Sequence, residues 1–427
     1  RMVRTAVSVG KVLSNLRTVM GKVNNFLKKL GPGLLFAGTA IGVSHLVQST
    51  KAGAEFGFGL TWALLLAIIL KYPFFKYAPK YSLVTNESVL HGYKKLHTTL
   101  PIFFFLITLG TMFTIQTAVT IVTAGLANSI FGDIISVEIW TLIILVLSFF
   151  MLLIGKYKTL DKLIKYLIIA LTISTILSFI FAGLNFSKPV DIKQVFPTDS
   201  NGVIFLIAFM GWMPAPLDVS VWNSLWTIEK RKQQKNYSVS NSLFDFNLGY
   251  FGTAILGVCF IGVGYFTIYG TENILSESAG IFSNQLIHLY TDNLGYWSYY
   301  LIAFAAFSTM LSTTITALDA SPRAMGITTE LIFNKEIKHA YLFWLIILLF
   351  GTIMIFFSFT SQMGLLIKIA TIISFMTAPF FAIMNYLLIS SKHTPKKNRP
   401  SKKMHILSIL GIIYLLGFSV FFLIKGM

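Results

Sequence analysis

Eleven mostly apolar stretches run through this chain of 427 residues, and each is about as long as, or longer than, the roughly 20 residues that a helix needs to cross a bilayer. Only 12% of the residues are charged, about half the share typical of a soluble domain. The sequence therefore predicts an all-α integral membrane protein. The predicted spans are 32–54, 58–79, 100–130, 138–155, 162–184, 202–226, 245–270, 295–324, 339–358, 362–390 and 404–425.

The positive charges are distributed unevenly between the predicted loops. Lys and Arg outnumber Asp and Glu by 34 to 16, and with an internal N-terminus 28 of the 34 fall in the inner loops and the N-terminal segment. Membrane proteins collect Lys and Arg on the cytoplasmic side, so this excess indicates topology and not a nucleic-acid partner. We expect a multi-pass protein of the plasma (inner) membrane, with a cytoplasmic N-terminus and the C-terminus outside.

The spans predict a simple domain organisation. A cytoplasmic basic segment, 1–30, precedes a ten-helix core at 31–390 with repeats at about 31–184 and 202–390; a cytoplasmic loop, 391–403, which we expect to be a flexible connector, leads to an eleventh helix at 404–427. The outer loop has helical apolar spacing over 280–290, which predicts an interfacial helix. There is no GxxxxGK[ST] motif for ATP, so we do not expect this chain to drive transport with ATP, and no ATPase partner is evident. The expected partners are the bilayer and a small solute or ion.

The first and sixth spans differ from the others because both are interrupted. The first has Gly38, Gly42, Ser44 and His45 at membrane depth, and the sixth has the segment Phe209-Met-Gly-Trp-Met-Pro-Ala-Pro-Leu-Asp218. Proline removes a backbone donor and clashes with the preceding turn, and unpaired backbone inside a bilayer is tolerated only where it faces protein or a cavity. The breaks therefore predict a central site, and their spacing of five spans predicts two inverted repeats.

The residues around these breaks resemble a known family. Gly31-Pro-Gly-Leu-Leu35, Ala52-Gly-Ala-Glu-Phe-Gly57, Met213-Pro214 and the segment from Ser374 to Pro379 are similar to motifs of the Nramp divalent-metal transporters. The resemblance covers nearly the whole chain. It implies a LeuT-type fold of five plus five helices in inverted repeats, with broken helices 1 and 6 and an added eleventh helix.

The chain departs from this family at the metal ligands. Where the family has Asp-Pro-Gly-Asn in the first span, this chain has Gly42-Val-Ser-His45, and the family's Met-Pro-His becomes Met213-Pro-Ala215. Gln116 and Val119 align with acidic residues of the proton route, and Thr371 aligns with a glutamine near the site. Hard divalent cations prefer oxygen ligands that include carboxylates. The neutral site thus disfavours the usual family substrate and its proton route.

A small zwitterion fits such a neutral site better than a dication. We expect a secondary transporter that moves a small organic solute, such as an amino acid, by alternating access. In this hypothesis the first break binds a carboxylate through backbone amides, and free carbonyls near Phe209 and Met210 receive the ammonium group. The candidate substrate-binding residues are Gly42, Ser44, His45, Met210, Gly211, Trp212, Met213, Ala215, Asp218 and Thr371.

Several alternatives stay open from the sequence. His45 lines the site or bonds to a neighbouring helix, and Asp218 contacts a cation or pairs with a buried lysine such as Lys51. Asp319 and Arg323 are expected to be a structural pair, since they lie four residues apart on one helix.

Other functions also stay open. In a second hypothesis, the substrate is a metal ion held by His45 and Met213 instead of an organic solute. In a third, the chain is a sensor that does not transport. No cofactor is expected, but the coupling ion is Na⁺ or H⁺, with Ser312 and Thr313 as candidate Na⁺ ligands. No set of nucleophile, base and orienting group is evident, so we do not expect an enzyme.

Overall fold

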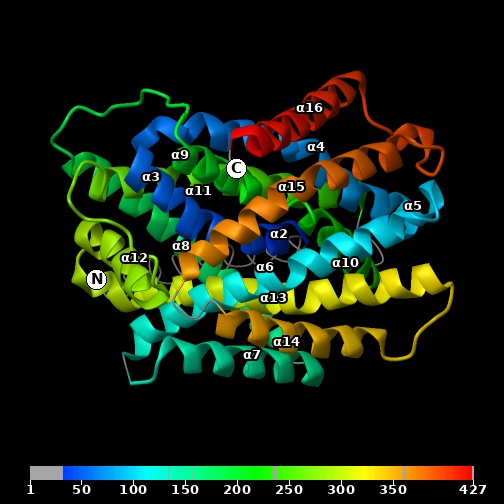
Figure 1. Cartoon of the computed structure of the whole chain (residues 1–427), viewed down its shortest axis with the longest axis horizontal. Helices are drawn as coiled ribbons and strands as arrows, with labels where there is room; N and C mark the ends of the chain where they lie inside the picture. Colours follow the sequence, from blue (N-terminus) through cyan, green and yellow to red (C-terminus); the bar gives the residue numbers. More distant parts are fainter. Residues whose placement is uncertain (1–31, 133, 156, 234–237, 359–361, 426–427) are drawn as a thin grey trace, which may run out of the picture.

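A computed structural model of the chain describes residues 32–132, 134–155, 157–233, 238–358 and 362–425. Within these ranges the chain is helical and contains no strand, as expected for an all-α membrane protein. The predicted N-terminal segment 1–30 lies outside the described residues. Long helices run side by side in a bundle, and shorter helices lie at its two ends (Figure 1).

The helices follow the chain in an order close to the predicted one. They are α2 (Pro32–Ala40), α3 (Thr50–Phe56), α4 (Thr61–Thr85), α5 (Val89–Leu96), α6 (Leu100–Phe131), α7 (Val137–Ile154), α8 (Tyr157–Asn185), α9 (Ser200–Trp212), α10 (Val219–Gln233), α11 (Val239–Thr267), α12 (Ala279–Leu294), α13 (Tyr299–Phe333), α14 (Ala340–Ser358), α15 (Met363–Ser390) and α16 (Lys402–Lys425). A π-helical turn, η1 (Ser44–Ser49), and 3₁₀ turns η2 (Gly57–Leu60), η3 (Tyr296–Ser298) and η4 (Lys396–Asn398) complete them.

The first and sixth spans are both broken, as predicted. The first consists of α2 and of η1 with α3, separated at residues 41–43, and the sixth consists of α9 and α10, separated at residues 213–218. Nine helical runs among the described residues are long and apolar enough to cross a membrane. One of these runs, Ser44–Thr85, contains both the second half of the first span and the second span. The chain turns sharply between them at Gly57, whose φ of +60° is one that glycine tolerates.

The connections between the spans agree less well with the sequence analysis. The interfacial helix expected at 280–290 is present as α12, whereas the short helix α5 between the second and third spans was not expected. The connector at 391–403 is not an irregular linker. Thr394 is buried and donates to the Leu388 carbonyl, and Arg399 donates to the Thr394 carbonyl, so the segment folds into a hydrogen-bonded turn.

The surface of the bundle is apolar along its sides. Large apolar side chains stand exposed on the outer faces of α7, α14 and α16, for example Leu147, Phe350 and Ile413. Exposed surface of this kind is stable only against lipid. In Figure 1, α16 lies on one side of the bundle and α7 and α14 lie on the opposite side, while α12 and α5 lie at opposite ends. The charge distribution predicts that the α12 end is external.

The broken first span is held at the centre by close contact with α11. A Cβ atom on Gly53 would lie 1.9 Å from the Ile261 carbonyl oxygen, and one on Gly264 would lie 2.3 Å from the Thr50 carbonyl oxygen. The same holds at the other end of the crossing, where Gly249 approaches the Gly33 carbonyl. Glycine is needed at these positions because the backbones themselves are in contact.

This crossing is testable with two substitutions on the same helix. Gly264→Val places side-chain atoms against the backbone of α3, and such overpacking costs about 1–3 kcal/mol or more. Gly252→Val, also on α11, is the control, because a Cβ there meets nothing within 4 Å. We expect a clear fall in the melting temperature of the detergent-purified protein for Gly264→Val alone. Equal melting temperatures for the two variants would contradict the proposed packing.

Candidate functional site

The break in the first span leaves backbone carbonyls without helical partners, and side chains from the break itself satisfy them. The Ser44 hydroxyl lies within hydrogen-bonding distance of the Ala40 carbonyl at the end of α2 and 3.2 Å from the Pro214 carbonyl in the other break. Ser44 is therefore a direct link between the two breaks. Its hydroxyl also lies 2.8 Å from His45 Nδ1.

His45 is fully buried, and each of its ring nitrogens lies near a backbone carbonyl. Its Nδ1 lies 2.7 Å from the Ala40 carbonyl oxygen, and its Nε2 lies 2.9 Å from the Thr253 carbonyl oxygen on α11. The imidazole therefore joins the end of α2 to a neighbouring helix. A metal ion at either nitrogen would have to displace one of these contacts, and a role in lining the site stays a prediction.

The break in the sixth span receives a lysine from the second span. Lys71 of α4 is fully buried, and its ammonium group donates to the carbonyls of Met210 and Gly211, at 2.7 and 2.9 Å. These carbonyls lie in the last turn of α9, where a helix carries partial negative charge. The hypothesis that the Met210 carbonyl receives a substrate ammonium therefore needs correction, because the protein's own ammonium occupies that position.

Asp218 begins the second half of the sixth span. Its carboxyl group lies at the N-terminus of α10, beside the backbone amides of Asp218 and Val219, and it interacts electrostatically with Lys71. The side chain is buried, and Oδ1 has no hydrogen-bond partner in the described structure. The suggested pairing with Lys51 is wrong, since the Lys51 ammonium pairs with Glu277 at 2.6 Å.

The candidates on α9 and α15 hold the two helices together. Gly211 brings α9 against the backbone of α15, since a Cβ there would lie 2.3 Å from the Thr371 carbonyl oxygen. The Trp212 indole donates to Ser374 at 2.8 Å. The Thr371 hydroxyl donates to carbonyls of its own helix, those of Ile367 and Lys368. Its carbonyl oxygen, in contrast, faces Gly211 of α9.

Gly42 and the candidate sodium ligands lie together between the first and eighth spans. A Cβ on Gly42 would lie 3.2 Å from the Thr313 side chain, and the Thr313 hydroxyl donates to the Gly38 carbonyl of α2 at 3.1 Å. Ser312 is buried beside it on α13. A hydroxyl and a first-span carbonyl thus meet as the sodium hypothesis requires, and Na⁺ or H⁺ coupling stays a prediction.

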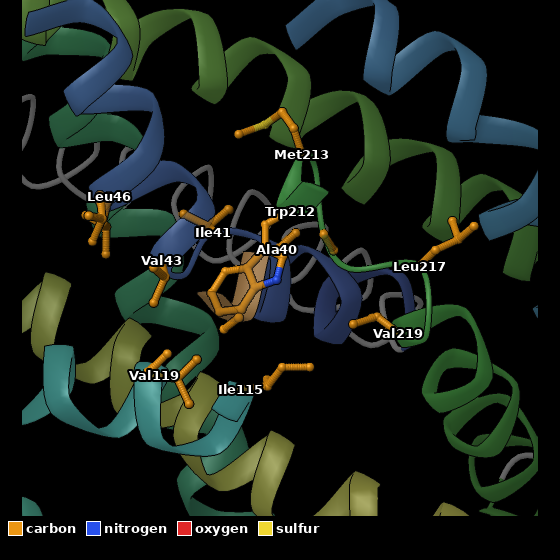
Figure 2. Packing of buried hydrophobic residues seen from close by; sticks show 14 of the residues in the cluster. Ala40, Ile41, Val43, Leu46, Ile115, Val119, Trp212, Met213, Leu217 and Val219 are labelled. Atoms are coloured by element: carbon orange, nitrogen blue, oxygen red, sulfur yellow. The ribbon is translucent and has the colours of Figure 1, made fainter. Parts of the chain in front are cut away.

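Apart from Ser44 and His45, the side chains that pack between the two breaks are mostly apolar. Figure 2 shows the Trp212 indole beside Ala40, with Ile115 and Val119 of α6 on one side and Met213 on the other. Met213 and Ala215 are fully buried. This lining, together with Ile41 and Val43 at the first break, suits an apolar group better than a hydrated ion.

A neutral polar network lies where the resembling family carries acids. The Gln116 amide donates to the Thr120 hydroxyl and the Thr314 carbonyl, both at 3.2 Å, and the Thr123 and Thr314 hydroxyls lie 2.8 Å apart. This network joins α6 to α13 without a titratable group. Farther along α13, Asp319 and Arg323 form the predicted ion pair at 2.8 Å.

The structure thus brings Ser44, His45, Met213 and Ala215 to one buried centre and turns the Thr371 hydroxyl toward its own helix. It also adds Lys71, to which the sequence alone gave no role. A lysine in an otherwise apolar segment is itself a signal, because intramembrane charges are costly unless they are paired.

Two broken spans that meet at a buried centre, within repeats of five helices, define a membrane transporter of the LeuT-type fold. The chain belongs to the Nramp family, since the family model for natural resistance-associated macrophage protein-like sequences matches residues 33–425. It is a divergent member, because the residues at its breaks differ from the family's metal ligands.

The relatives cover nearly the whole chain. An uncharacterized protein of Pasteurella multocida (strain Pm70) is 36% identical over 92% of this chain and 91% of its own length. The metal transporter Nramp6 of Arabidopsis thaliana is 23% identical over 94% of this chain and 78% of its own length.

Two solved structures show the same fold. The Eremococcus coleocola manganese transporter, in complex with an aromatic bis-isothiourea compound, has a TM-score of 0.70 at 13% identity, over 92% of this chain and 85% of that chain. The structure of MhsT in complex with L-phenylalanine has a TM-score of 0.62 at 13% identity, over 92% of this chain and 98% of that chain.

The role of Lys71 is testable through stability. Lys71→Met keeps the length of the side chain but removes the donor to two carbonyls, and a hydrogen bond to a charged group contributes about 1.5–3 kcal/mol. We expect a fall in melting temperature that corresponds to a few kcal/mol. Lys80→Met on the same helix is the control, because Lys80 is only partly buried. A melting temperature for Lys71→Met equal to that of the control would refute this role.

Proposed function

We propose that this protein is a secondary transporter that moves a small organic solute of the amino-acid class across the membrane by alternating access. The observation that carries the proposal is the position of Lys71, whose ammonium group is bound to the Met210 and Gly211 carbonyls at the sixth-span break. The protein therefore supplies its own cation where an incoming cation would otherwise find free carbonyls.

The charges at this break favour a zwitterion over a dication. The Lys71 amino group donates to two carbonyls, and Asp218 lies close enough to interact with it, so the basic and acidic groups together add no net charge to the centre. A dication would meet a like charge in a medium of low dielectric, whereas a zwitterion places its carboxylate toward Lys71 and its ammonium toward the unpartnered Oδ1 of Asp218. This arrangement reverses the polarity expected from the sequence for the sixth-span break.

The surroundings of the charges support the same substrate class. Trp212, Ile115 and Val119 form an apolar lining between the breaks (Figure 2), which suits an aliphatic or aromatic side chain. MhsT, the fold neighbour bound to L-phenylalanine, is an example of this fold with an amino acid.

A second candidate is transport of a metal ion, which is favoured by the names of two similar proteins, a metal transporter and a manganese transporter. His45 and Met213 would then be the ligands. This candidate requires His45 to release the Ala40 or Thr253 carbonyl and requires a dication close to Lys71.

Uptake into proteoliposomes separates the two candidates. We expect saturable uptake of at least one of the twenty amino acids and little uptake of Mn²⁺. Asp218→Asn retains an N-cap residue for α10 but removes the negative charge, so it should reduce amino-acid uptake about tenfold or more. Asp292→Asn, at an exposed position on α12, is the control.

The opposite result has a clear form. Saturable Mn²⁺ uptake that is lost in His45→Ala and Met213→Ala, without uptake of any amino acid, would overturn the organic-solute proposal in favour of a rebuilt metal site.

A further inference from the structure

A separate cavity of about 310 Å³ lies between the broken spans and the α12 end of the bundle. Its walls come from η1 and α3, from α9, from the start of α15 and from the loop before α12. Gln48 lies one turn after His45, and Ala208 lies two residues before Met210, so the floor of the cavity adjoins the central site. A solute that enters from the α12 end therefore meets this cavity before the breaks.

An ion pair joins two walls of the cavity. Glu277, from the loop before α12, accepts a hydrogen bond from Lys51 of α3 at 2.6 Å. The same carboxylate lies against Gly364 in the first turn of α15, where a Cβ would meet Glu277 Oε2 at 1.1 Å. Gln285 of α12 holds this loop through hydrogen bonds to Ser276 and Ile274.

Gln48, Glu55 and Lys368 are among the further polar side chains that line the cavity, and Glu55 also interacts electrostatically with Lys51 and Glu277. The side chain of Gln48 is 5% exposed, and its carbonyl oxygen, Oε1, has no hydrogen-bond partner in the described structure. Lys368 of α15 and Glu55 of α3 also line the cavity. Among the described residues no ion pair joins either of them to another side chain.

We propose that this cavity is a second binding site, for a small zwitterion with an amino and a carboxylate group. The inference rests on the proposed function for its substrate class. The carboxylate of the solute binds the Lys368 ammonium, and its amino group donates to Gln48 Oε1 and pairs with Glu55. A buried acceptor without a donor costs free energy, and a bound ammonium group removes that cost.

The matched charges also select against simple ions. A lone anion satisfies Lys368 but leaves Gln48 Oε1 unpaired and faces the acidic Glu55. A lone cation satisfies Gln48 Oε1 and Glu55 but faces the basic Lys368. Only a solute with both groups satisfies all three side chains at once. The site thus captures at the α12 end the same class of solute that the central site is proposed to carry.

The experiment uses the full-length protein and the amino acid that gives the largest thermal shift in a panel of twenty. Lys368→Met and Gln48→Leu should each raise the KM for uptake of this amino acid about tenfold, because each removes one charge-assisted hydrogen bond to the solute. Vmax should be retained, because the central site is intact. Lys368→Arg keeps the charge and should retain the wild-type KM. Lys193→Met removes an exposed loop lysine outside the cavity and is the control.

The outcomes separate this inference from the function on which it rests. Normal wild-type uptake with an unchanged KM in both Lys368→Met and Gln48→Leu would overturn the second site alone. If no amino acid shifts the melting temperature or enters proteoliposomes, both proposals fail. A shift with Mn²⁺ that Gln48→Leu removes would reassign the cavity to a cation and likewise overturn the inference.

Discussion

Backbone groups at the two helix breaks must find partners inside a bilayer, and the structure of this protein depends on how they do so. Water is absent at that depth, so each unpaired group is costly. Here side chains provide the partners. Ser44 and His45 lie against the carbonyl at the end of α2, Thr313 binds the Gly38 carbonyl, and Lys71 binds the end of α9. Asp218 lies beside the amides that begin α10. These contacts join the broken spans to α4, α11 and α13.

These partners explain how the chain keeps the Nramp scaffold without the family's metal ligands. The charge at its centre consists of one lysine and one aspartate, which come from different spans and interact with each other. The neighbouring side chains are apolar or neutral, from Trp212 and Val119 to the Gln116 network. The proposed zwitterion substrate rests on this balance of an acidic and a basic group, within helices that belong to the Nramp family.

Most of the fold was predictable because the bilayer imposes a simple length requirement. Apolar windows located the spans, and the prolines and glycines of the sixth and first spans located the breaks. The short helix α5 was missed because its eight residues are too few to cross a bilayer, so the length requirement that located the spans does not apply to it. Lys51 was only one example of a buried lysine that could pair with Asp218, and the structure places Lys71 there instead. Lys51, Lys71 and Lys368 all lie in apolar spans, and the sequence does not show which of them faces the sixth-span break.

The sequence by itself determined where helices cross the membrane, where two of them break and which ligands of the family are missing, because these properties depend on residue type and local spacing. The tertiary structure decided which side chain meets which free carbonyl. Lys71 reaches Met210 across 139 positions of sequence, and the Thr371 hydroxyl turns toward its own helix. Such contacts depend on the rotation of each helix about its axis and on the glycine crossings that bring backbones together. Both are set by packing among distant segments, which local spacing does not encode.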